Sequence, residues 1–479
     1  MVGEVGSLGK HLALVGFMGA GKTTIGREVA RLTQRPFLDT DEEIERRFGP
    51  IPQIFAERGE AEFRRLEAEV VAQALASPHP SVIALGGGAV EESAMRARLE
   101  EHVALRVPVD VDEAWGRVRG SDRPLARDES EFRRLHDRRQ ELYRQVGREA
   151  RDVEGALLEA LCVRTGRGIG ARVAEHAGPR SALIADELVL GLHRPAGRFE
   201  VHPVPRGEAA KNVQVPLRLW RELLLPRDGT VVALGGGSTT DVAGFVAATY
   251  LRGVRWIAVP TSLVGQVDAA IGGKTGIDLP WGKNLVGAFH FPVLVLIDPD
   301  LLSTLPEEER RQGMAEVVKT GLLAGQPLWE LPEEEMVRAC AAFKCAVVLS
   351  DPYERGRRAI LNLGHTFGHA LEAETGFSDR LLHGEAVALG MALAFRFSAR
   401  RGLCTPADAE RVEAHLAALE LPTRLDIGTP AALVAHMRSD KKATGGRVPF
   451  ILARGIGEAF VDHSVAPEEV EGFLASELG

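Results

Sequence analysis

The sequence is short of cysteine, of positive charge and of long apolar runs. Its four cysteines, Cys162, Cys340, Cys345 and Cys404, form no CxxC pair, so we expect reduced, mostly buried thiols rather than a disulfide framework. The net charge of -9 argues against nucleic acid as the main partner. No apolar stretch has the length of a membrane span, and the apolar run near the N-terminus leads into a glycine loop rather than a cleavage site. These absences predict a cytoplasmic protein without a membrane span or a cleaved leader.

The length and composition predict more than one domain. At 479 residues the chain is too long for one ordinary core, and its 45% hydrophobic and 26% charged residues are typical of a soluble globular protein. In residues 1–160, strand-like runs and glycine loops alternate with charged helical segments, which predicts an α/β domain with a parallel sheet. A new series of strand and helix signals starts near residue 161. We expect an α/β half over residues 161–305 and a mostly helical half over residues 306–479.

A phosphate-binding pattern stands near the N-terminus. The segment GFMGAGKTT fits G-x-x-x-x-G-K-[ST] with Gly16, Gly21, Lys22 and Thr23. A chance glycine turn is the alternative, but a strand-like run precedes the segment and a helix-like run follows it. In such a loop, backbone N–H groups wrap phosphate oxygens, the lysine meets the β- and γ-phosphates and the hydroxyl binds Mg²⁺. The pattern therefore predicts a site for ATP with Mg²⁺.

Two carboxylates follow this loop in the segment LDTD, at Asp39 and Asp41. One of them could orient or deprotonate an acceptor hydroxyl, while the other could help to position metal or substrate. Either could also cap the helix that EEIERRF predicts. We expect Asp41 to combine the two uses.

Taken in order, six segments of the first domain resemble shikimate kinase over about residues 10–150: GFMGAGKTT, LDTDEEIERRFG, IFAERGEAEFRRLE, VIALGGG, DRPL and RRQELY. The resemblance implies ATP-dependent phosphorylation of shikimate, with Lys22 and Asp41 as catalytic residues. It implies an ATP site at Gly19, Gly21, Lys22, Thr23, Thr24 and Arg123, with Thr23 as the Mg²⁺ ligand. It places the substrate at Asp41, Arg64, Gly87 and Arg139.

The two arginines suit this substrate, because a guanidinium group binds a carboxylate through two parallel hydrogen bonds. Taken alone, Arg64 would be read equally well as part of a solvated helix face. The segment departs from the family in two places. The turn GPIPQIF is one residue shorter than usual, and DRPLA replaces the commoner RPLL.

In the second half, VVALGGGSTTD places three glycines after an apolar strand, where a pyrophosphate could approach the start of a helix. The pattern is not GxGxxG, so as a dinucleotide signal it is weak alone. The following segment carries Asp268, Lys274, Lys283 and Asn284 in what we interpret as glycine-rich loops. Two lysines amid so little other charge indicate anion binding, with a solvated loop as the alternative.

The segment LNLGHTFGHALE places His365 and His369 four residues apart, on one face of a predicted helix. Glu316 and His383 stand on other predicted helices, and one carboxylate with two imidazoles from separate helices would form a three-ligand Zn²⁺ site with an open position. Taken singly, each histidine could equally be an ordinary core or surface residue. Glu316 alone would be an ordinary helix carboxylate.

As a set, the motifs of the second half resemble 3-dehydroquinate synthase over about residues 165–460. The resemblance implies that Glu316, His365 and His383 bind Zn²⁺ or Co²⁺, and that His369 moves protons beside the substrate. The catalytic residues it implies are Lys274, Lys319, Arg358, Asn362 and His369. The substrate residues it implies are Arg252, Lys274, Lys344, Arg358, Asn362, His369 and Lys442, with Lys441 competing for the last place.

The same resemblance implies bound NAD. The NAD residues it implies are Asp186, Glu208, Lys211, Gly236, Gly237, Asp241, Thr261, Ser262, Asp268, Lys283, Asn284 and Thr304. Arg252 corresponds to a residue that reaches the site of a neighbouring subunit, which predicts a homodimer through the synthase half.

The leading interpretation is one polypeptide with two enzymes of the shikimate pathway, which leads to chorismate and the aromatic amino acids. One enzyme phosphorylates shikimate to shikimate 3-phosphate. The other converts 3-deoxy-D-arabino-heptulosonate 7-phosphate to 3-dehydroquinate with release of phosphate. The alternatives are a related polyol dehydrogenase or sugar-phosphate carbocycle synthase in the second half, and a non-catalytic nucleotide sensor in the first.

Overall fold

The computed structural model describes residues 8–378, 380–439 and 448–478, which form two compact units. The N-terminal unit is Gly3–Arg164, with which the segment Cys345–Ser350 is grouped, and the C-terminal unit is Thr165–Lys344 with Asp351–Gly479. Each unit has its own sheet and its own apolar core. Within the described ranges, no helix combines the length and the apolar character that a membrane span requires.

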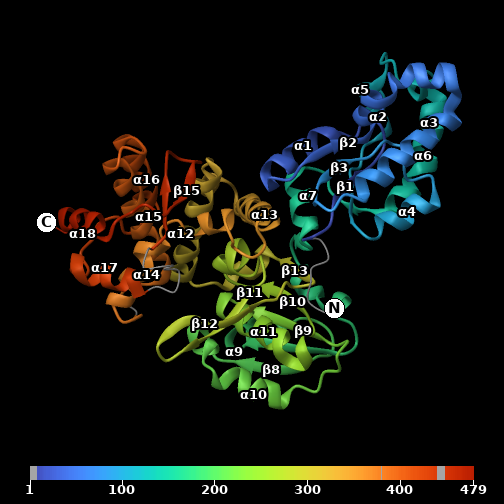
Figure 1. The fold of residues 1–479 in the computed structure, drawn as a ribbon. Coiled ribbons are helices and arrows are strands. Elements are labelled where there is room, and N and C mark those ends of the chain that lie inside the picture. The colour runs from blue at the N-terminus through green and yellow to red at the C-terminus, as the bar shows by residue number, and fades with distance from the viewer. Residues whose placement is uncertain (1–7, 379, 440–447, 479) are drawn as a thin grey trace. The chain divides into compact units, whose positions relative to one another are not determined.

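The N-terminal unit is built on a five-stranded sheet in the order β2-β3-β1-β4-β5, and its pairings are parallel (Figure 1). The parallel α/β class predicted for this unit is confirmed. The central strand β1 reads LALV and is buried throughout, as expected of a strand covered on both faces. The strands are β1 (Leu12–Val15), β2 (Phe37–Asp39), β3 (Val82–Ala84), β4 (Val103–Arg106) and β5 (Arg148–Glu149). The helices are α1 (Lys22–Thr33), α2 (Thr40–Phe48), α3 (Ile51–Leu75), α4 (Ser93–Leu99), α5 (Val111–Val118), α6 (Glu129–Val146) and α7 (Val153–Ala160).

The C-terminal unit begins with a six-stranded sheet in the order β6-β13-β10-β9-β7-β8. The pairings β7–β8, β7–β9, β9–β10 and β10–β13 are parallel, so the predicted α/β half is confirmed. The strands are β6 (Val163–Thr165), β7 (Ser181–Asp186), β8 (Glu200–Val204), β9 (Thr230–Gly235), β10 (Arg255–Pro260) and β13 (Leu294–Ile297). The helices that accompany them are α8 (Ala174–Ala177), α9 (Glu187–Leu192), α10 (Gln214–Glu222) and α11 (Gly237–Thr249).

Between β10 and β13 along the chain, the strands β11 (Lys274–Leu279) and β12 (Gly282–Phe289) form a separate antiparallel hairpin. The expectation of glycine-rich loops is wrong here, because these strands carry Lys274, Lys283 and Asn284. The glycines indicate close backbone approach instead of a loop.

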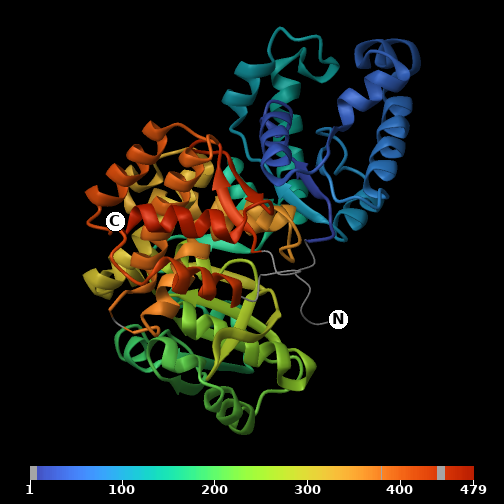
Figure 2. The same cartoon turned by 60° about the vertical axis from the view of Figure 1, so that its left-hand side comes forward.

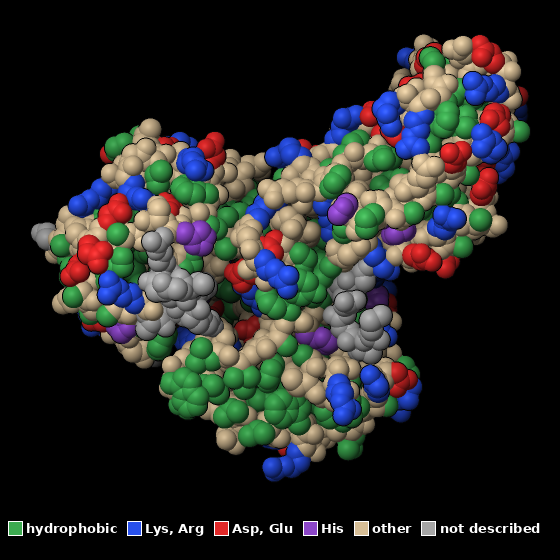
Figure 3. Space-filling view, in the orientation of Figure 1, with side chains coloured by type: hydrophobic (Ala, Val, Ile, Leu, Met, Phe, Trp, Pro, Cys, Tyr) green, Lys and Arg blue, Asp and Glu red, His purple; other side chains and the backbone are tan. Residues whose placement is uncertain are grey.

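The glycines Gly276 and Gly287 face each other in the hairpin, and a Cβ on Gly287 would lie 2.3 Å from the carbonyl oxygen of Thr275. The outer side of the hairpin is apolar and open to solvent. Leu285 is 40% exposed and Trp281 is 76% exposed, and hydrophobic side chains gather over this part of the unit (Figure 3).

The rest of the C-terminal unit, coloured from yellow through orange to red in Figure 2, is mostly helical, and its apolar core includes residues of α14 and α15. Its helices are α12 (Glu307–Ala324), α13 (Glu333–Ser350), α14 (His365–Glu374), α15 (His383–Arg400), α16 (Pro406–Ala418), α17 (Pro430–Ser439) and α18 (Pro467–Glu477). The prediction of a mostly helical half is confirmed, but the prediction did not include one hairpin that the structure contains. The strands β14 (Phe450–Ala453) and β15 (Ala459–Asp462) pair antiparallel and pack against α15, which lets a short apolar run form a strand rather than a helix.

Glycines allow α14 and α15 to approach closely. A Cβ on Gly390 of α15 would lie 2.0 Å from the carbonyl oxygen of Gly364 and 3.0 Å from the backbone nitrogen of Gly368. Gly364 itself precedes α14 with a φ of 82°, a left-handed conformation that favours glycine. This contact fixes where the first turn of α14 begins.

The substitution Gly390→Ala should lower the free energy of unfolding of the C-terminal unit by about 1–3 kcal/mol, the usual cost of overpacking a core. The methyl group would push α14 away from α15. Urea unfolding followed by tryptophan fluorescence measures this, because four of the chain's five tryptophans lie in this unit.

The matched control is Gly472→Ala on α18, where no atom of the described residues beyond its own neighbours lies within 4 Å of an added Cβ. Alanine is favoured over glycine in a helix by about 1 kcal/mol, so this variant should be neutral or slightly more stable. Equal effects of the two substitutions would contradict the packing account.

Candidate functional site

The glycine loop of the N-terminal unit joins β1 to α1 and leaves the start of α1 open. Gly21 occupies the position before α1 with a φ of 88°, and no side chain caps this helix in the described part of the chain. The ammonium group of Lys22 donates to the carbonyl oxygens of Gly16 and Phe17 at 2.9 and 3.0 Å, so it lies over the loop. Burial lowers the pKa of Lys22 to about 8, although Asp41 opposes this. The arrangement suits an anion, because bare N–H groups and a lysine face the same space.

Asp39 and Asp41 take different places beside this loop. Asp39 accepts hydrogen bonds from the backbone N–H groups of Asp41 and Glu42 at 3.0 and 3.4 Å, and from the hydroxyl of Thr23 at 2.6 Å. Asp39 therefore caps α2, and the expectation that Asp41 does so is wrong. Asp41 lies in the first turn of the helix, where its carboxyl is left for other partners. Burial raises the pKa of Asp41, and electrostatic repulsion from the carboxylate of Asp39 raises it further.

The three glycines after β3 are pressed against charged side chains. A Cβ on Gly86 would lie 2.3 Å from Oε1 of Glu67 and 2.6 Å from Oδ1 of Asp41, and one on Gly88 would lie 1.7 Å from Nη1 of Arg64. Any larger residue would therefore displace these groups. Glu67 is buried, and burial raises the pKa of its carboxyl. The sequence does not distinguish it from any other carboxylate of a charged helix.

The arginines Arg64 and Arg139 come from α3 and α6 and meet near Gly87. Arg64 pairs with Glu67 at 2.7 Å, and Arg139 pairs with Glu91 at 3.0 Å. A Cβ on Gly87 would lie 3.7 Å from Nη1 of Arg139. The structure therefore brings together the four residues predicted for the substrate of this unit.

Three further residues predicted at the nucleotide are Gly19, Thr24 and Arg123. Gly19 has a φ of 80° and packs against the backbone of α5, while Thr24 is exposed on α1. Arg123 precedes a short 3-10 turn and is close enough to Lys22 to contribute to the lowering of its pKa.

In the C-terminal unit, Glu316, His365 and His383 meet from three helices, α12, α14 and α15. One potential ligand atom from each of the three lies within 4.8 Å of the others. The Nε2 atoms of both histidines lie 3.8 Å from Oε1 of Glu316, too far for a hydrogen bond. Ligands of a tetrahedral Zn²⁺ ion lie about 3.5 Å from one another, so this spacing leaves room for a cation between them.

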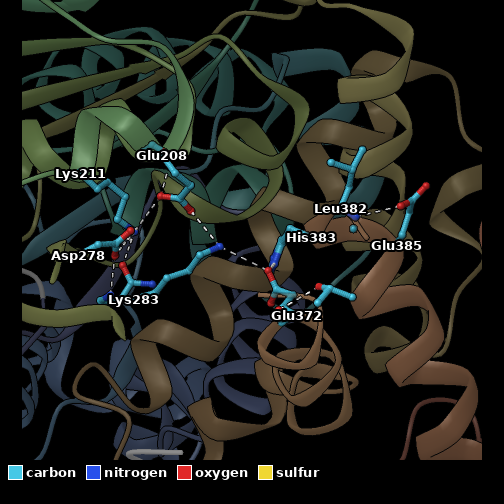
Figure 4. A network of polar contacts seen from close by, with 12 residues as sticks. Glu208, Lys211, Asp278, Lys283, Glu372, Leu382, His383 and Glu385 are labelled. Carbon is cyan, nitrogen blue, oxygen red and sulfur yellow. Dashed lines mark hydrogen bonds and ion pairs between the residues drawn. The ribbon is translucent and has the colours of Figure 1, made fainter. Parts of the chain in front are cut away.

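The remaining ring nitrogens point to acceptors that fix the rings. Nδ1 of His365 lies 3.3 Å from the carbonyl oxygen of Leu363, and Nδ1 of His383 lies 3.4 Å from Oε1 of Glu372 (Figure 4). This is the usual outer contact of a metal-binding histidine, and it leaves Nε2 of both rings for a metal ion. The structure thus shows a candidate metal site with two orienting contacts.

The charge balance of the cluster favours a cation. Glu316 is 1% exposed; burial acts to raise its pKa, but Lys319 and His383 outweigh this effect and lower the pKa to about 2. Burial acts to lower the pKa of His383, but the carboxylates of Glu316 and Glu372 raise it to about 10. An imidazole between two carboxylates holds a proton, and a metal ion would take the same electrostatic role.

His369 lies on the same face of α14 as His365, with ring centroids 5.4 Å apart. It is not part of the three-residue cluster found among the described residues. The pair in HTFGH therefore places one imidazole in the cluster and the other one turn away.

The buried basic residues predicted for the substrate lie in one network around the cluster. The ammonium group of Lys344 donates to the backbone carbonyl oxygen of Asp268 at 2.6 Å and to its Oδ1 at 2.5 Å. Burial lowers the pKa of Lys344 to about 8, although Asp268 opposes this. Lys319 pairs with Glu316, and electrostatic attraction to Asp268 outweighs burial and raises its pKa.

A second group of these residues surrounds Glu354. Lys274 forms an ion pair with Glu354, and Asn362 donates to its Oε1 at 2.8 Å. Arg358 is buried and donates to the carbonyl oxygens of Pro352 and Gly272 at 2.6 and 2.8 Å. Glu354 has a φ of 55°, and it is not among the residues predicted for the site.

Four residues predicted for NAD form one cluster around the buried side chain of Lys211. Lys211 lies 3.0 Å from Asp241 and 3.8 Å from Glu208, and it hydrogen-bonds to Asn284. Burial raises the pKa of Asp241 to about 6 against the effect of Lys211. Lys283, the next residue predicted for NAD, lies 3.8 Å from Glu208.

The other residues predicted for NAD lie at the ends of parallel strands. Gly236 precedes α11, for which the described residues supply no side-chain cap, and a Cβ on Gly236 would lie 3.2 Å from Oγ of Ser262. Asp186 ends β7 and caps α9 by accepting from Leu188 at 2.9 Å. Gly237, Thr261 and Asp268 follow β9 and β10 on the same side, whereas Thr304 lies at the surface beside His193. The carboxyl edge of a parallel sheet is the usual place for such a ligand.

Two predicted substrate residues stand apart from this network. Arg252 is exposed after α11 and has a φ of 67°. Lys442 and its competitor Lys441 lie outside the described residues.

Comparison with known families accounts for both units. The family model described as 3-dehydroquinate synthase N-terminal matches residues 201–312, and the one described as 3-dehydroquinate synthase C-terminal matches residues 313–443. The model described as shikimate kinase matches residues 18–161.

Individual relatives match the second part of the chain. The chain is similar to the 3-dehydroquinate synthase of Paracoccus denitrificans, with 45% identity over 65% of this chain and 95% of the relative. It is 49% identical to that of Caulobacter vibrioides over 64% of this chain and 92% of the relative. The solved structure of 2-epi-5-epi-valiolone synthase from Streptomyces hygroscopicus, which holds NAD⁺ and Zn²⁺, superposes with a TM-score of 0.59 at 28% identity, over 66% of this chain and 95% of that one.

These matches cover the two units separately and agree with the motifs of each. The chain belongs to the 3-dehydroquinate synthase family and carries a shikimate kinase domain on its N-terminal side, which gives one polypeptide both activities.

Proposed function

We propose that the C-terminal unit converts 3-deoxy-D-arabino-heptulosonate 7-phosphate to 3-dehydroquinate beside the cluster of Glu316, His365 and His383. The observation that carries this proposal is the meeting of these three side chains from three helices next to a group of buried lysines. The donor set of two imidazoles and one carboxylate fits Zn²⁺ or Co²⁺ with a position left for substrate. When bound, such an ion polarises substrate oxygens and stabilises developing negative charge.

NAD⁺ would lie along the carboxyl edge of the six-stranded sheet. The open start of α11 at Gly236 offers N–H groups to the pyrophosphate, and the Lys211 cluster offers polar partners to the rest of the nucleotide. Asp186 and Thr304 would contact its outer parts. When bound, NAD⁺ would serve as the temporary hydride acceptor that this class of reaction requires.

The protein's own side chains would bind and orient the substrate. Lys274, Lys344 and Arg358 would neutralise the phosphate and carboxylate groups, because Lys344 and Arg358 are buried cations and Lys274 is an exposed one that pairs with Glu354. Asn362 would hold the substrate in place. His369 and Glu354 would move protons, since His369 lies beside His365, Glu354 pairs with Lys274 and neither belongs to the metal cluster.

In the N-terminal unit, ATP would bind over the glycine loop with Lys22 on its phosphates and Mg²⁺ at Thr23. Asp41 would accept the proton of the shikimate hydroxyl, because its carboxyl is not used for capping α2. Arg64 and Arg139 would bind the substrate carboxylate beside Gly87.

The C-terminal unit would form a homodimer in the cytoplasm. The strand β12 exposes the apolar side chains of Leu285 and Val286, which a second copy could cover. Arg252 would then contribute to the neighbouring site from its exposed position after α11.

Loss of a metal ligand tests the synthase proposal. Glu316→Gln and His365→Ala should each reduce phosphate release from the heptulosonate substrate more than about 100-fold, since even outer contacts of a metal site are worth 10–100-fold. Shikimate-dependent ADP formation by the same variants should be unchanged. Phosphate release that survives both substitutions, or accumulation of NADH without phosphate release by the unaltered protein, would contradict the proposal.

The kinase proposal predicts the opposite pattern, in which the kinase activity is lost and the synthase activity is kept. Lys22→Ala should reduce shikimate-dependent ADP formation by about 10²–10³-fold, the typical effect of removing one group that stabilises transition-state charge. Phosphate release at the other unit should stay within about twofold of the unaltered protein. ADP formation that persists at the original rate would mean that the loop does not act on ATP.

The pKa of Lys344 predicts a pH dependence. Its pKa is about 8, and its ammonium group must be protonated to bind an anion, so kcat/KM of the synthase should fall as the pH rises above about 8. The charged groups that face Lys344 are Asp268, Arg358 and Lys319. In Lys344→Arg the guanidinium stays charged, so the alkaline fall should move to higher pH. An unchanged profile in this variant would assign the fall to another group.

A further inference from the structure

Glu372 is a buried carboxylate that none of the predicted sites includes. It is 4% exposed, and it stands on α14 seven residues after His365 and three after His369, so all three share one face of the helix. Figure 4 shows its carboxylate between His383 and Lys283, which come from α15 and β12. A buried carboxylate in such a position must have both partners to offset its lost hydration.

On one side Glu372 fixes a ligand of the proposed metal site. Its Oε1 lies 3.4 Å from Nδ1 of His383, while Nε2 of that ring faces Glu316. The backbone of His383 is already fixed, because Glu385 accepts from Leu382 at 3.0 Å and Gln312 accepts from Gly384 at 2.6 Å. Only the rotation of the ring is left, and Glu372 sets it.

On the other side the same oxygen reaches the nucleotide region. Oε1 of Glu372 lies 3.5 Å from Nζ of Lys283, and Lys283 lies 3.8 Å from Glu208. Glu208 is exposed and lies 3.8 Å from the buried Lys211. An unbroken series of charged contacts therefore runs from a metal ligand to the cluster proposed for NAD⁺ (Figure 4).

We propose that Glu372 is a positioning residue that couples the two cofactor sites, so that a bound metal ion and bound NAD⁺ strengthen each other. A metal ion on Nε2 fixes the ring of His383, the ring fixes Glu372, and Glu372 holds Lys283 where the nucleotide binds. The coupling is reciprocal by thermodynamic necessity. The inference rests on the proposed function, which assigns the metal and the nucleotide to these clusters.

Binding measurements on the full-length, metal-free protein test this coupling. Zn²⁺ affinity is measured by competition with a chromophoric chelator, and NAD⁺ affinity by calorimetry with and without Zn²⁺. The unaltered protein should bind NAD⁺ at least about fivefold more tightly when Zn²⁺ is present, within the usual range of site coupling. Glu372→Gln should weaken Zn²⁺ binding about 10–100-fold and bring the ratio of NAD⁺ affinities close to one.

The matched control is Glu374→Gln, on the same helix, where the carboxylate pairs with His436 at 2.9 Å instead. It should keep the Zn²⁺ affinity and the NAD⁺ ratio of the unaltered protein. A second variant, Lys283→Gln, breaks only the nucleotide side of the bridge. It should leave Zn²⁺ affinity within about twofold while abolishing the coupling, which separates lost positioning from misfolding.

Two failures can be told apart. If the unaltered protein binds both cofactors but Glu372→Gln matches Glu374→Gln in Zn²⁺ affinity and in the NAD⁺ ratio, the coupling through Glu372 is overturned and the proposed function stands. If the unaltered protein binds no Zn²⁺, the proposed function fails, and the coupling fails with it.

Discussion

The buried charge of Glu316 is the constraint on which the C-terminal unit depends. A carboxylate that is 1% exposed can stay ionised only where positive groups surround it, and Lys319 from the same helix supplies one of them. The histidines that face its other oxygen begin two further helices. Tertiary packing must therefore bring α12, α14 and α15 together around this one charge. The same groups that offset the burial of Glu316 also form the candidate metal site.

In both units, glycines allow the close approach that brings charged side chains into the candidate site. In the N-terminal unit, the glycines after β3 let Asp41, Glu67 and Arg64 approach the backbone. In the C-terminal unit, Gly364 and Gly390 let two helices approach each other, which places the first residue of α14 in the metal cluster. Both sites thus rely on glycines that make room for charged side chains, rather than on glycines that make a loop flexible.

The sequence could predict the fold class and the segments that meet in the candidate sites, because short motifs such as GKTT and HTFGH carry their chemistry locally. It could not predict which aspartate caps α2, since Asp39 and Asp41 are equally good caps and only the folded backbone shows that Asp39 accepts from the N–H groups of Asp41 and Glu42. The glycines of β11 and β12 were read as loops because a closely paired strand and a loop share that composition. Glu372 could not be recognised, because its partners lie on other elements, far apart in the sequence.

The central claim is that Glu316, His365 and His383 hold one metal ion with His369 left outside. Anomalous X-ray scattering at the zinc absorption edge, from crystals of the chain grown with Zn²⁺, tests it most directly. The account predicts one strong peak at about 2.1 Å from Nε2 of both cluster histidines and from a carboxylate oxygen of Glu316. A peak bound by His365 and His369 together, or one that lies away from Glu316, would contradict it.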